Sequence, residues 1–274
     1  GYPTGFGRNS QRVLLPAFLS AYTGLGIFNS GQGETAKKVS LGLFRDFPIP
    51  NWTIKYTGLM RLESFKEKFK RFSVQHGYKA SYTLNAFRSN LDLYSDGGLD
   101  PSGNFKPETL VGNVNLVEAF SPLAKVDFET KGSVKIAAEV KKDRAISLSF
   151  DNNLLTEVKG VEYVGSFGYR IKDVTISTRL SDSPSGVIKS DLNFKLDFSY
   201  RNNKTIVRYL DYNNNQIGGG QNIWQAKFTA DYSFSKNLTM IFFYDHSFSK
   251  AVISTSFPIT NIRSGITLRY NFGN

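Results

Sequence analysis

The stretch Asp191–Tyr200, DLNFKLDFSY, decides the fold that this sequence can adopt. Apolar or aromatic residues occupy every second position, and polar or charged residues occupy every position between them. Because successive side chains of a β-strand point to opposite faces, this alternation predicts a strand with one apolar face and one polar face. Three further stretches, residues 72–86, 224–234 and 266–272, repeat the pattern.

Weaker alternation predicts additional strands, which brings the expected total to about a dozen. These weaker strands fall near residues 52–59, 123–130, 133–141, 145–150, 161–171, 174–180, 205–210 and 238–247. Short turns are expected at Lys142-Asp143, Arg201-Asn202-Asn203 and Ser235-Lys236-Asn237, and longer loops at 90–108, 181–186 and 211–222. Short turns at one end and long loops at the other are typical of outer-membrane barrels.

The composition excludes a helical membrane protein. Hydrophobic residues make up 40% of the 274-residue chain, and the mean hydropathy is -0.29. No run approaches the roughly 18–20 apolar residues that a transmembrane helix needs. A strand that crosses a membrane needs only about 9–11 residues, of which every second one is apolar.

Alternation alone also fits a soluble β-protein, but three features favour a membrane. Charged residues such as Lys195 and Asp231 stand at strand centres, as a wet lumen allows. Tyr200 and Tyr232 lie near strand ends, where interfacial girdles of aromatic residues occur. The last strand carries Phe272 close to the chain end, as the closing strands of many outer-membrane barrels do.

We therefore predict an all-β fold, an antiparallel transmembrane β-barrel segment in the outer membrane. The residues expected to face lipid are Leu192, Phe194, Leu196, Phe198, Trp224, Phe228, Tyr232, Leu268, Tyr270 and Phe272. The residues expected to face the lumen are Asn193, Lys195, Asp197, Lys227, Asp231 and Arg269.

The net charge of +11 and the lack of cysteine further limit the partners and kinds of site that we expect. The basic residues are scattered singly along alternating strands, so we expect no nucleic-acid partner. They could face anionic lipid head groups or line a polar lumen, and the pattern leaves both open. Without cysteine the chain has no disulfide scaffold, thiolate metal site or cysteine nucleophile.

Residues 1–50 break the pattern, and residues 51–274 carry it. Pro16 predicts a short helix over Ala17–Tyr22 with Gly24 as its C-terminal stop. A second short helix is expected where Leu62, Phe65 and Phe69 share one face, either as a turn between strands or as an amphipathic segment at a membrane interface. No signal peptide precedes these elements, so we expect a mature product or a piece of a longer protein.

We expect no catalytic residue, metal or cofactor. His76 and His246 are the only histidines, and neighbours in the run Asp245-His246-Ser247 point to opposite faces of a strand and cannot converge as a triad. The runs at 96–104 (DGGLDPSGN) and 211–215 (DYNNN) resemble calcium loops in composition. Neither has the ligand spacing of an EF-hand, and turn chemistry explains both more simply.

Three strings resemble the C-terminal region of the SprA family, called Sov in some species. They are QRVLLPAFLSAYTG at 11–24, RDFPIPNWTIKYTG at 45–58 and KFTADYSFSKNLTMIFFYDHSFSKAVISTSFPIT at 227–260. The most specific parts are the segment Pro48–Trp52 (PIPNW) and the closing strands at 223–273. The loop at 90–101 has no counterpart in the resemblance.

The resemblance implies a function. This family forms the outer-membrane translocons of the type IX secretion system in the Bacteroidota, single-chain barrels of roughly 36 strands. They export folded cargo with a C-terminal signal domain and, in gliding species, adhesins. The implied partners are the remainder of the same barrel polypeptide, a PorV-like outer-membrane protein, a periplasmic plug protein, the cargo and outer-membrane lipid. No single residue carries over as a functional site.

Other functions stay open from the sequence. The chain could be a self-contained porin or transporter barrel of about 12 strands, which needs a first strand able to pair with 266–272. A barrel enzyme would require a lumen-facing cluster that includes His76 or His246. A surface adhesion protein and a soluble β-protein are the remaining alternatives.

Overall fold

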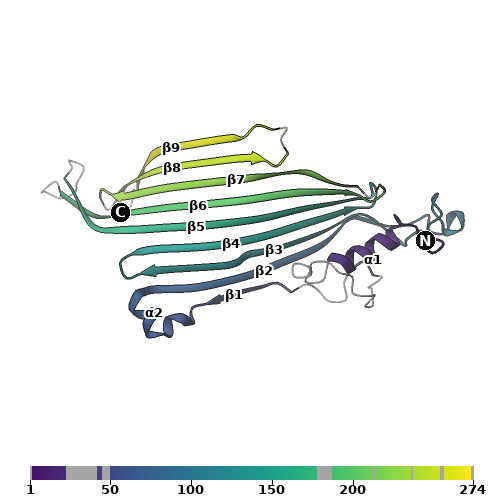
Figure 1. The fold of residues 1–274 in the computed structure, drawn as a ribbon, viewed down its shortest axis with the longest axis horizontal. Helices are drawn as coiled ribbons and strands as arrows, with labels where there is room; N and C mark the ends of the chain where they lie inside the picture. Colours follow the sequence, from purple (N-terminus) through teal and green to yellow (C-terminus); the bar gives the residue numbers. More distant parts are fainter. Residues whose placement is uncertain are drawn as a thin grey trace.

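The structure, a computed structural model, describes residues 2–22, 42–44, 50–177, 187–212, 214–235, 237–253 and 256–272. Within these ranges the chain forms a single sheet of nine antiparallel strands in which every strand pairs with its neighbours in sequence order, from β1 to β9. Figure 1 shows β1 and β9 at opposite edges of this open sheet. The all-β antiparallel fold predicted from the alternation is confirmed.

The strands differ in length, from 5 residues in β1 to 24 residues in β5. They are β1 (Trp52–Tyr56), β2 (Phe69–Ser89), β3 (Thr109–Thr130), β4 (Val134–Ser149), β5 (Leu154–Ser177), β6 (Val187–Tyr209), β7 (Asn214–Ser233), β8 (Leu238–Ala251) and β9 (Ile259–Tyr270). The helices are α1 (Gln11–Tyr22), α2 (Glu63–Lys68) and the 3-10 turns η1 (Gly58–Arg61) and η2 (Ser95–Gly98). Among the described residues, no helix is long and apolar enough to cross a membrane.

Within the described residues the chain forms nine strands rather than the expected dozen or so, because predicted breaks lie inside continuous strands. Lys142 and Asp143 pair with Val161 and Gly160 in the middle of the β4–β5 ladder. The expected turn at 201–203 likewise lies within β6, paired to β5 and β7. The alternation disappears at these positions because both faces of the sheet are polar there, and a strand that is polar on both faces has the composition of a turn.

The loop predictions are confirmed in part. Residues 90–108 do connect β2 to β3, and Ser235 and Asn237 lie in the connection from β7 to β8. Most of the predicted loop at 211–222 belongs to β7 instead. The predicted loop at 181–186, Lys236 and Gly24 lie outside the described residues. Short connections occur at both ends of the strands, at 131–133 and at 150–153, so they are not confined to one end as expected.

The N-terminal helix starts earlier than predicted. The carbonyl oxygen of Ser10 accepts the N–H groups of Val13 and Leu14 at 2.9 Å each, which begins α1 before Pro16. The proline therefore lies inside the helix, where it costs one backbone hydrogen bond. Burial of Phe18 and its apolar neighbours against the sheet outweighs that loss, because packing rather than propensity holds most protein helices.

Helix α1 lies against one end of the strands and forms the main apolar core with them. Its buried residues Leu15, Phe18 and Leu19 pack against β3, β4 and β5. The strand residues in this core are Val111, Val114, Leu116, Ile146, Leu148 and Leu155. The predicted second helix is present as α2 at the opposite end of the strands, where Phe65 packs against Phe69 and Phe72 (Figure 1).

The segment before α1 is tied to the 90–108 loop and to β3. The N–H of Gly7 donates to the side-chain oxygen of Asn104 at 2.6 Å, and the Phe105 N–H donates to the Gly5 carbonyl at 2.8 Å. The amide of Gln11 extends the β3 ladder, since it donates to the Thr109 carbonyl at 2.7 Å and accepts from the backbone N–H two residues further on. These bonds fix where α1 begins.

Candidate functional site: the two faces of the sheet

The pairing register brings the predicted lipid-facing residues to one face. On β6 and β7, Leu192 pairs with Tyr232, and Leu196 pairs with Phe228. Directly paired residues of an antiparallel ladder lie on the same face. The same register carries this face onto β8 and β9, where Leu268 pairs with Met240. We call it the apolar face, and it holds Leu192, Phe194, Leu196, Phe198, Trp224, Phe228, Tyr232, Leu268 and Tyr270.

Phe272 lies just past the end of β9, with its ring 4.8 Å from the ring of Tyr270. The apolar face is exposed over much of its area: Leu196 is 45% exposed, Phe198 49% and Leu268 66%. Contiguous exposed apolar surface of this extent marks contact with another protein or with a membrane. The face as a whole therefore requires a covering.

Two rows of aromatic side chains lie along the two borders of the apolar face. The row nearer α1 runs across seven strands and consists of Trp52, Tyr78, Phe120, Tyr163, Tyr200, Trp224 and Phe248. Ring centroids of neighbours in this row lie 4.6–6.4 Å apart where they touch. The second group, at the other end, consists of Phe69, Phe72, Phe128, Tyr232, Phe234, Tyr270 and Phe272.

The distance between the two rows follows from strand geometry. On β7, Trp224 belongs to one row and Tyr232 to the other. At roughly 3.3 Å per residue, this part of the strand covers about 26 Å. The apolar band of an outer-membrane barrel is about 25 Å tall and is flanked by aromatic girdles at both interfaces. Because barrel strands tilt by about 35–45°, 26 Å along a strand projects to roughly 19–22 Å across the membrane, somewhat less than the full height of such a band.

The opposite face, which we call the polar face, holds the predicted lumen-facing residues. Asn193 pairs with Asp231 in the ladder, Asp197 pairs with Lys227, and Lys195 and Arg269 share this side of the sheet. Asp197 accepts hydrogen bonds from the ammonium of Lys195 and from the hydroxyl of Ser166, both at 2.7 Å. The amide of Asn193 donates to Asp231 at 2.8 Å.

A second network on the polar face centres on Arg201, which sequence patterns had assigned to a turn. Its guanidinium donates to both carboxylate oxygens of Asp143, at 2.9 and 3.1 Å, and to Glu162 at 3.3 Å. Gly160 makes room for this bond, because a Cβ there would lie 2.6 Å from the Asp143 carboxylate. The members of this network stand on three different strands, β4, β5 and β6, so no local sequence signal could have identified it.

Both histidines lie away from the polar face. His76 pairs with Ile54 and His246 with Ala226, which places both on the apolar face. Nδ1 of His76 lies 2.6 Å from the carbonyl oxygen of Leu123. Asp245 stands on the polar face and binds Arg263 at 3.0 Å, so it is separated from His246 as the strand geometry predicted. Among the described residues, no cluster of three or more metal-ligating side chains occurs.

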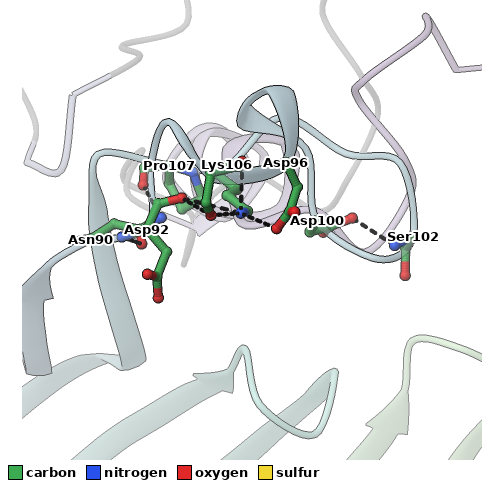
Figure 2. Close-up of polar contacts among 8 residues, drawn as sticks. Asn90, Asp92, Asp96, Asp100, Ser102, Lys106 and Pro107 are labelled. Carbon is green, nitrogen blue, oxygen red and sulfur yellow. Dashed lines mark hydrogen bonds and ion pairs between the residues drawn. The ribbon is translucent and has the colours of Figure 1, made fainter.

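The loop at 90–108 is held by a lysine. The ammonium of Lys106 donates to the carbonyl oxygens of Asp92 and Ser95, both at 3.1 Å, and to the Ser95 hydroxyl at 2.7 Å. It also pairs with the carboxylate of Asp96 at 3.5 Å (Figure 2). The positive charge among these oxygens is therefore supplied by the chain itself, which supports the turn interpretation of this segment.

Asp100 closes the tip of the same loop. Burial opposes ionisation of this carboxyl group, but hydrogen bonds from the backbone and side chain of Asn104 and from the backbone of Ser102, together with the charge of Lys106, outweigh it. The pKa of Asp100 is consequently lowered. The backbone N–H of Ser102 donates to the Asp100 carboxylate at 2.8 Å (Figure 2).

The sheet has two unpaired edges. β1 pairs only with β2, and β9 pairs only with β8, so each has one strand neighbour within the described residues. An exposed edge presents a row of unsatisfied backbone groups. In a membrane such an edge cannot stand against lipid, because no water is present to hydrogen-bond the backbone.

No protein-family model matches this chain, and no curated protein matches it.

Proposed function

We propose that this chain is part of the wall of an outer-membrane translocon of the type IX secretion system, through which folded cargo proteins and gliding adhesins leave the cell. The single observation that carries the proposal is the pair of opposed faces. One is apolar, exposed and bordered by aromatic rows about 26 Å apart along the strand; the other is charged and ion-paired.

Lipid is the covering that fits the apolar face. A soluble sandwich would bury this face against a second sheet, whereas within the described residues one sheet is present and only its α1 end is covered. The spacing of the aromatic rows, shortened by strand tilt to roughly 19–22 Å across the membrane, fits within the apolar band of an outer-membrane barrel. The Tyr and Trp residues in them have the amphipathic rings that favour membrane interfaces.

A wide, water-filled lumen is the environment that fits the polar face. Charged groups such as Asp197 and Arg201 remain partly exposed there and need bulk water beside them. Barrel diameter grows with strand number, and a folded cargo requires a wide lumen. The open edges β1 and β9 then pair with strands of the same polypeptide that lie outside this sequence.

The specific secretion system rests on the resemblance at 11–24, 45–58 and 227–260 to the SprA/Sov family. A PorV-like protein, a periplasmic plug and cargo with a C-terminal signal domain belong to the proposal on the same ground. The open sheet favours this function over a self-contained porin, because a small barrel must close through pairing of its first and last strands.

The mass of the native polypeptide tests the proposal. Outer membranes of the source cell are extracted with detergent, and the band that contains these peptides is identified by denaturing gel electrophoresis and mass spectrometry. A polypeptide several times larger than 30.7 kDa is expected. A native mass near 30.7 kDa would contradict the translocon and would leave the self-contained porin, whose solute conductance would then be measured.

A further inference from the structure

A line of cations crosses the apolar face immediately beyond the aromatic row nearer α1. We call it the basic belt, and it consists of Lys142, Arg144, Lys159, Lys204 and Lys250. Lys142 pairs directly with Phe120 of the aromatic row. Lys159 pairs with Arg144 on one side and with Lys204 on the other, so the belt is continuous from β4 to β6.

Two buried carboxylates neutralise part of the belt. Glu118 is 1% exposed and is bound by Arg144 and by the hydroxyl of Tyr78 at 2.8 Å. Glu157 is 2% exposed and is bound by Lys159 and Arg208, both at 3.0 Å. Within the belt, these two acids therefore neutralise Arg144 and Lys159, and Glu157 also binds Arg208 outside it.

Three lysines of the belt remain without a negative partner. Lys142, Lys204 and Lys250 form no ion pair within the described part of the chain. Lys142 and Lys250 are exposed, and Lys204 is half-exposed. These three cations, on β4, β6 and β8, create a positive surface on one face that attracts an anionic group.

The surroundings of the belt determine from which direction an anion can reach it. On one side stands the aromatic row, and on the other stands α1. The helix is fastened to the belt region, because the Arg208 guanidinium donates to the Tyr22 hydroxyl at 3.0 Å and Arg144 lies 5.8 Å from the centre of the same ring. Because the aromatic row and α1 flank the belt along the strands, an anion approaches it from the space in front of the apolar face.

We propose that the basic belt binds the phosphate groups of anionic lipids in the leaflet that contacts the aromatic row. The inference rests on the proposed membrane orientation, in which aromatic rings mark the interface and the next residues outward stand among the head groups. Lysine suits this position because its long stem lies along apolar surface while its ammonium reaches the polar layer.

Binding of a labelled phosphomonoester lipid tests the proposal. Full-length polypeptide is purified in a nonionic detergent, and saturable binding of radiolabelled phosphatidic acid is measured by co-elution in gel filtration. The test variant combines Lys142→Gln, Lys204→Gln and Lys250→Gln. The matched control combines Lys55→Gln, Lys79→Gln and Lys227→Gln, which lie on the polar face and also lack an ion pair within the described residues.

The expected loss is about fivefold in affinity per lysine of the belt, or on the order of a hundredfold for the triple variant. The control and the binding of zwitterionic phosphatidylcholine are expected to stay within twofold of the unaltered protein. Excess inorganic phosphate is expected to leave the lipid bound. Equal affinities of the test variant and the control would overturn the proposal, as would full displacement by inorganic phosphate, which would make free phosphate the ligand.

The same preparations separate this proposal from the proposed function. A folding check by heat-dependent gel migration is applied to both triple variants before binding is measured. If the basic belt binds no lipid, the native mass and the outer-membrane fractionation remain unchanged, so the translocon proposal survives. If the polypeptide is small or absent from the outer membrane, the translocon proposal fails by a measurement that does not involve the belt.

Discussion

The strands have two zones, in which different side chains occupy the same face of the sheet. Between the aromatic rows, apolar residues such as Leu196 cover one face and charged residues such as Asp197 cover the other. Beyond the row nearer α1, the first face changes to the basic belt and then to a core covered by the helix. Apolar and polar residues alternate between the rows and again under α1, where Leu116 and Ile146 are buried, and the alternation is interrupted at the basic belt, where the first face carries charge.

The largest effect is expected in the zone covered by α1. Phe18 is 3% exposed and lies at the centre of the helix–sheet core. Replacement of a buried phenylalanine by alanine costs about 3–5 kcal/mol, so Phe18→Ala should release α1 locally. Hydrogen exchange of the α1 amides should accelerate by a factor of roughly 10² or more. Ala17→Ser, on the exposed side of the same helix, is the control and should leave the exchange rates near their original values.

A smaller effect is expected between the aromatic rows. Phe194→Arg places a cation on the apolar face and should cost roughly 2–4 kcal/mol near mid-membrane. Lys195→Ala, one residue away on the polar face, should cost much less, since the Lys195 side chain is 61% exposed. Denaturant titration of the protein folded into lipid vesicles measures both. Equal costs would contradict the assignment of the faces.

The polar networks are expected to contribute less than either apolar surface. Arg201→Gln removes the ion pairs with Asp143 and Glu162, whose side chains are 34% and 21% exposed. Because solvent screens such groups, the expected loss is only about 1 kcal/mol, and it should shrink as salt is added. The same vesicle titration at low and high ionic strength gives the result. A loss above that of Phe194→Arg would show that the polar face is drier than proposed.

The smallest effect concerns the loop tip and pH. Because the pKa of Asp100 is lowered in the folded loop, its hydrogen bonds stabilise the tip above the ordinary aspartate pKa of 3.8. This stabilisation is lost as the pH falls through the lowered pKa. Protease cleavage at 96–104 should therefore be constant from pH 8 to pH 5 and rise only under stronger acid. Asp100→Asn, which keeps the shape without the charge, should abolish that dependence on pH.

The sequence predicted the zone between the aromatic rows well. Alternation in 191–200 and 224–234 predicted the strands and the residues on each face, because the polarity of each side chain there indicates which face it occupies. The lengths of the strands were predicted wrongly, because several strands continue through the expected turns. At Lys142-Asp143 and at 201–203 the apolar face carries polar side chains, Lys142 and Asn202, and a local pattern cannot distinguish a strand that is polar on both faces from a turn.

The remaining features depend on contacts between distant residues. The partners of Arg201 come from β4 and β5, and Glu118 is satisfied by residues of β2 and β4. The start of α1 was missed because Pro16 marks a first turn by propensity, whereas tertiary packing extends the helix ahead of it. The role of Lys106 as the cation of its loop required the loop conformation itself.

Labelling of adjacent positions tests the central claim most directly. Single cysteines are introduced as Lys195→Cys or Leu196→Cys into this cysteine-free stretch of the full-length protein, which is kept in its native membrane. We predict that a membrane-impermeant maleimide reacts at position 195, and that a fluorophore at position 196 is quenched by acyl-chain spin labels while position 195 is not. Equal water access at both positions, or the reverse pattern, would contradict a wall with lipid on one face and a wet lumen on the other.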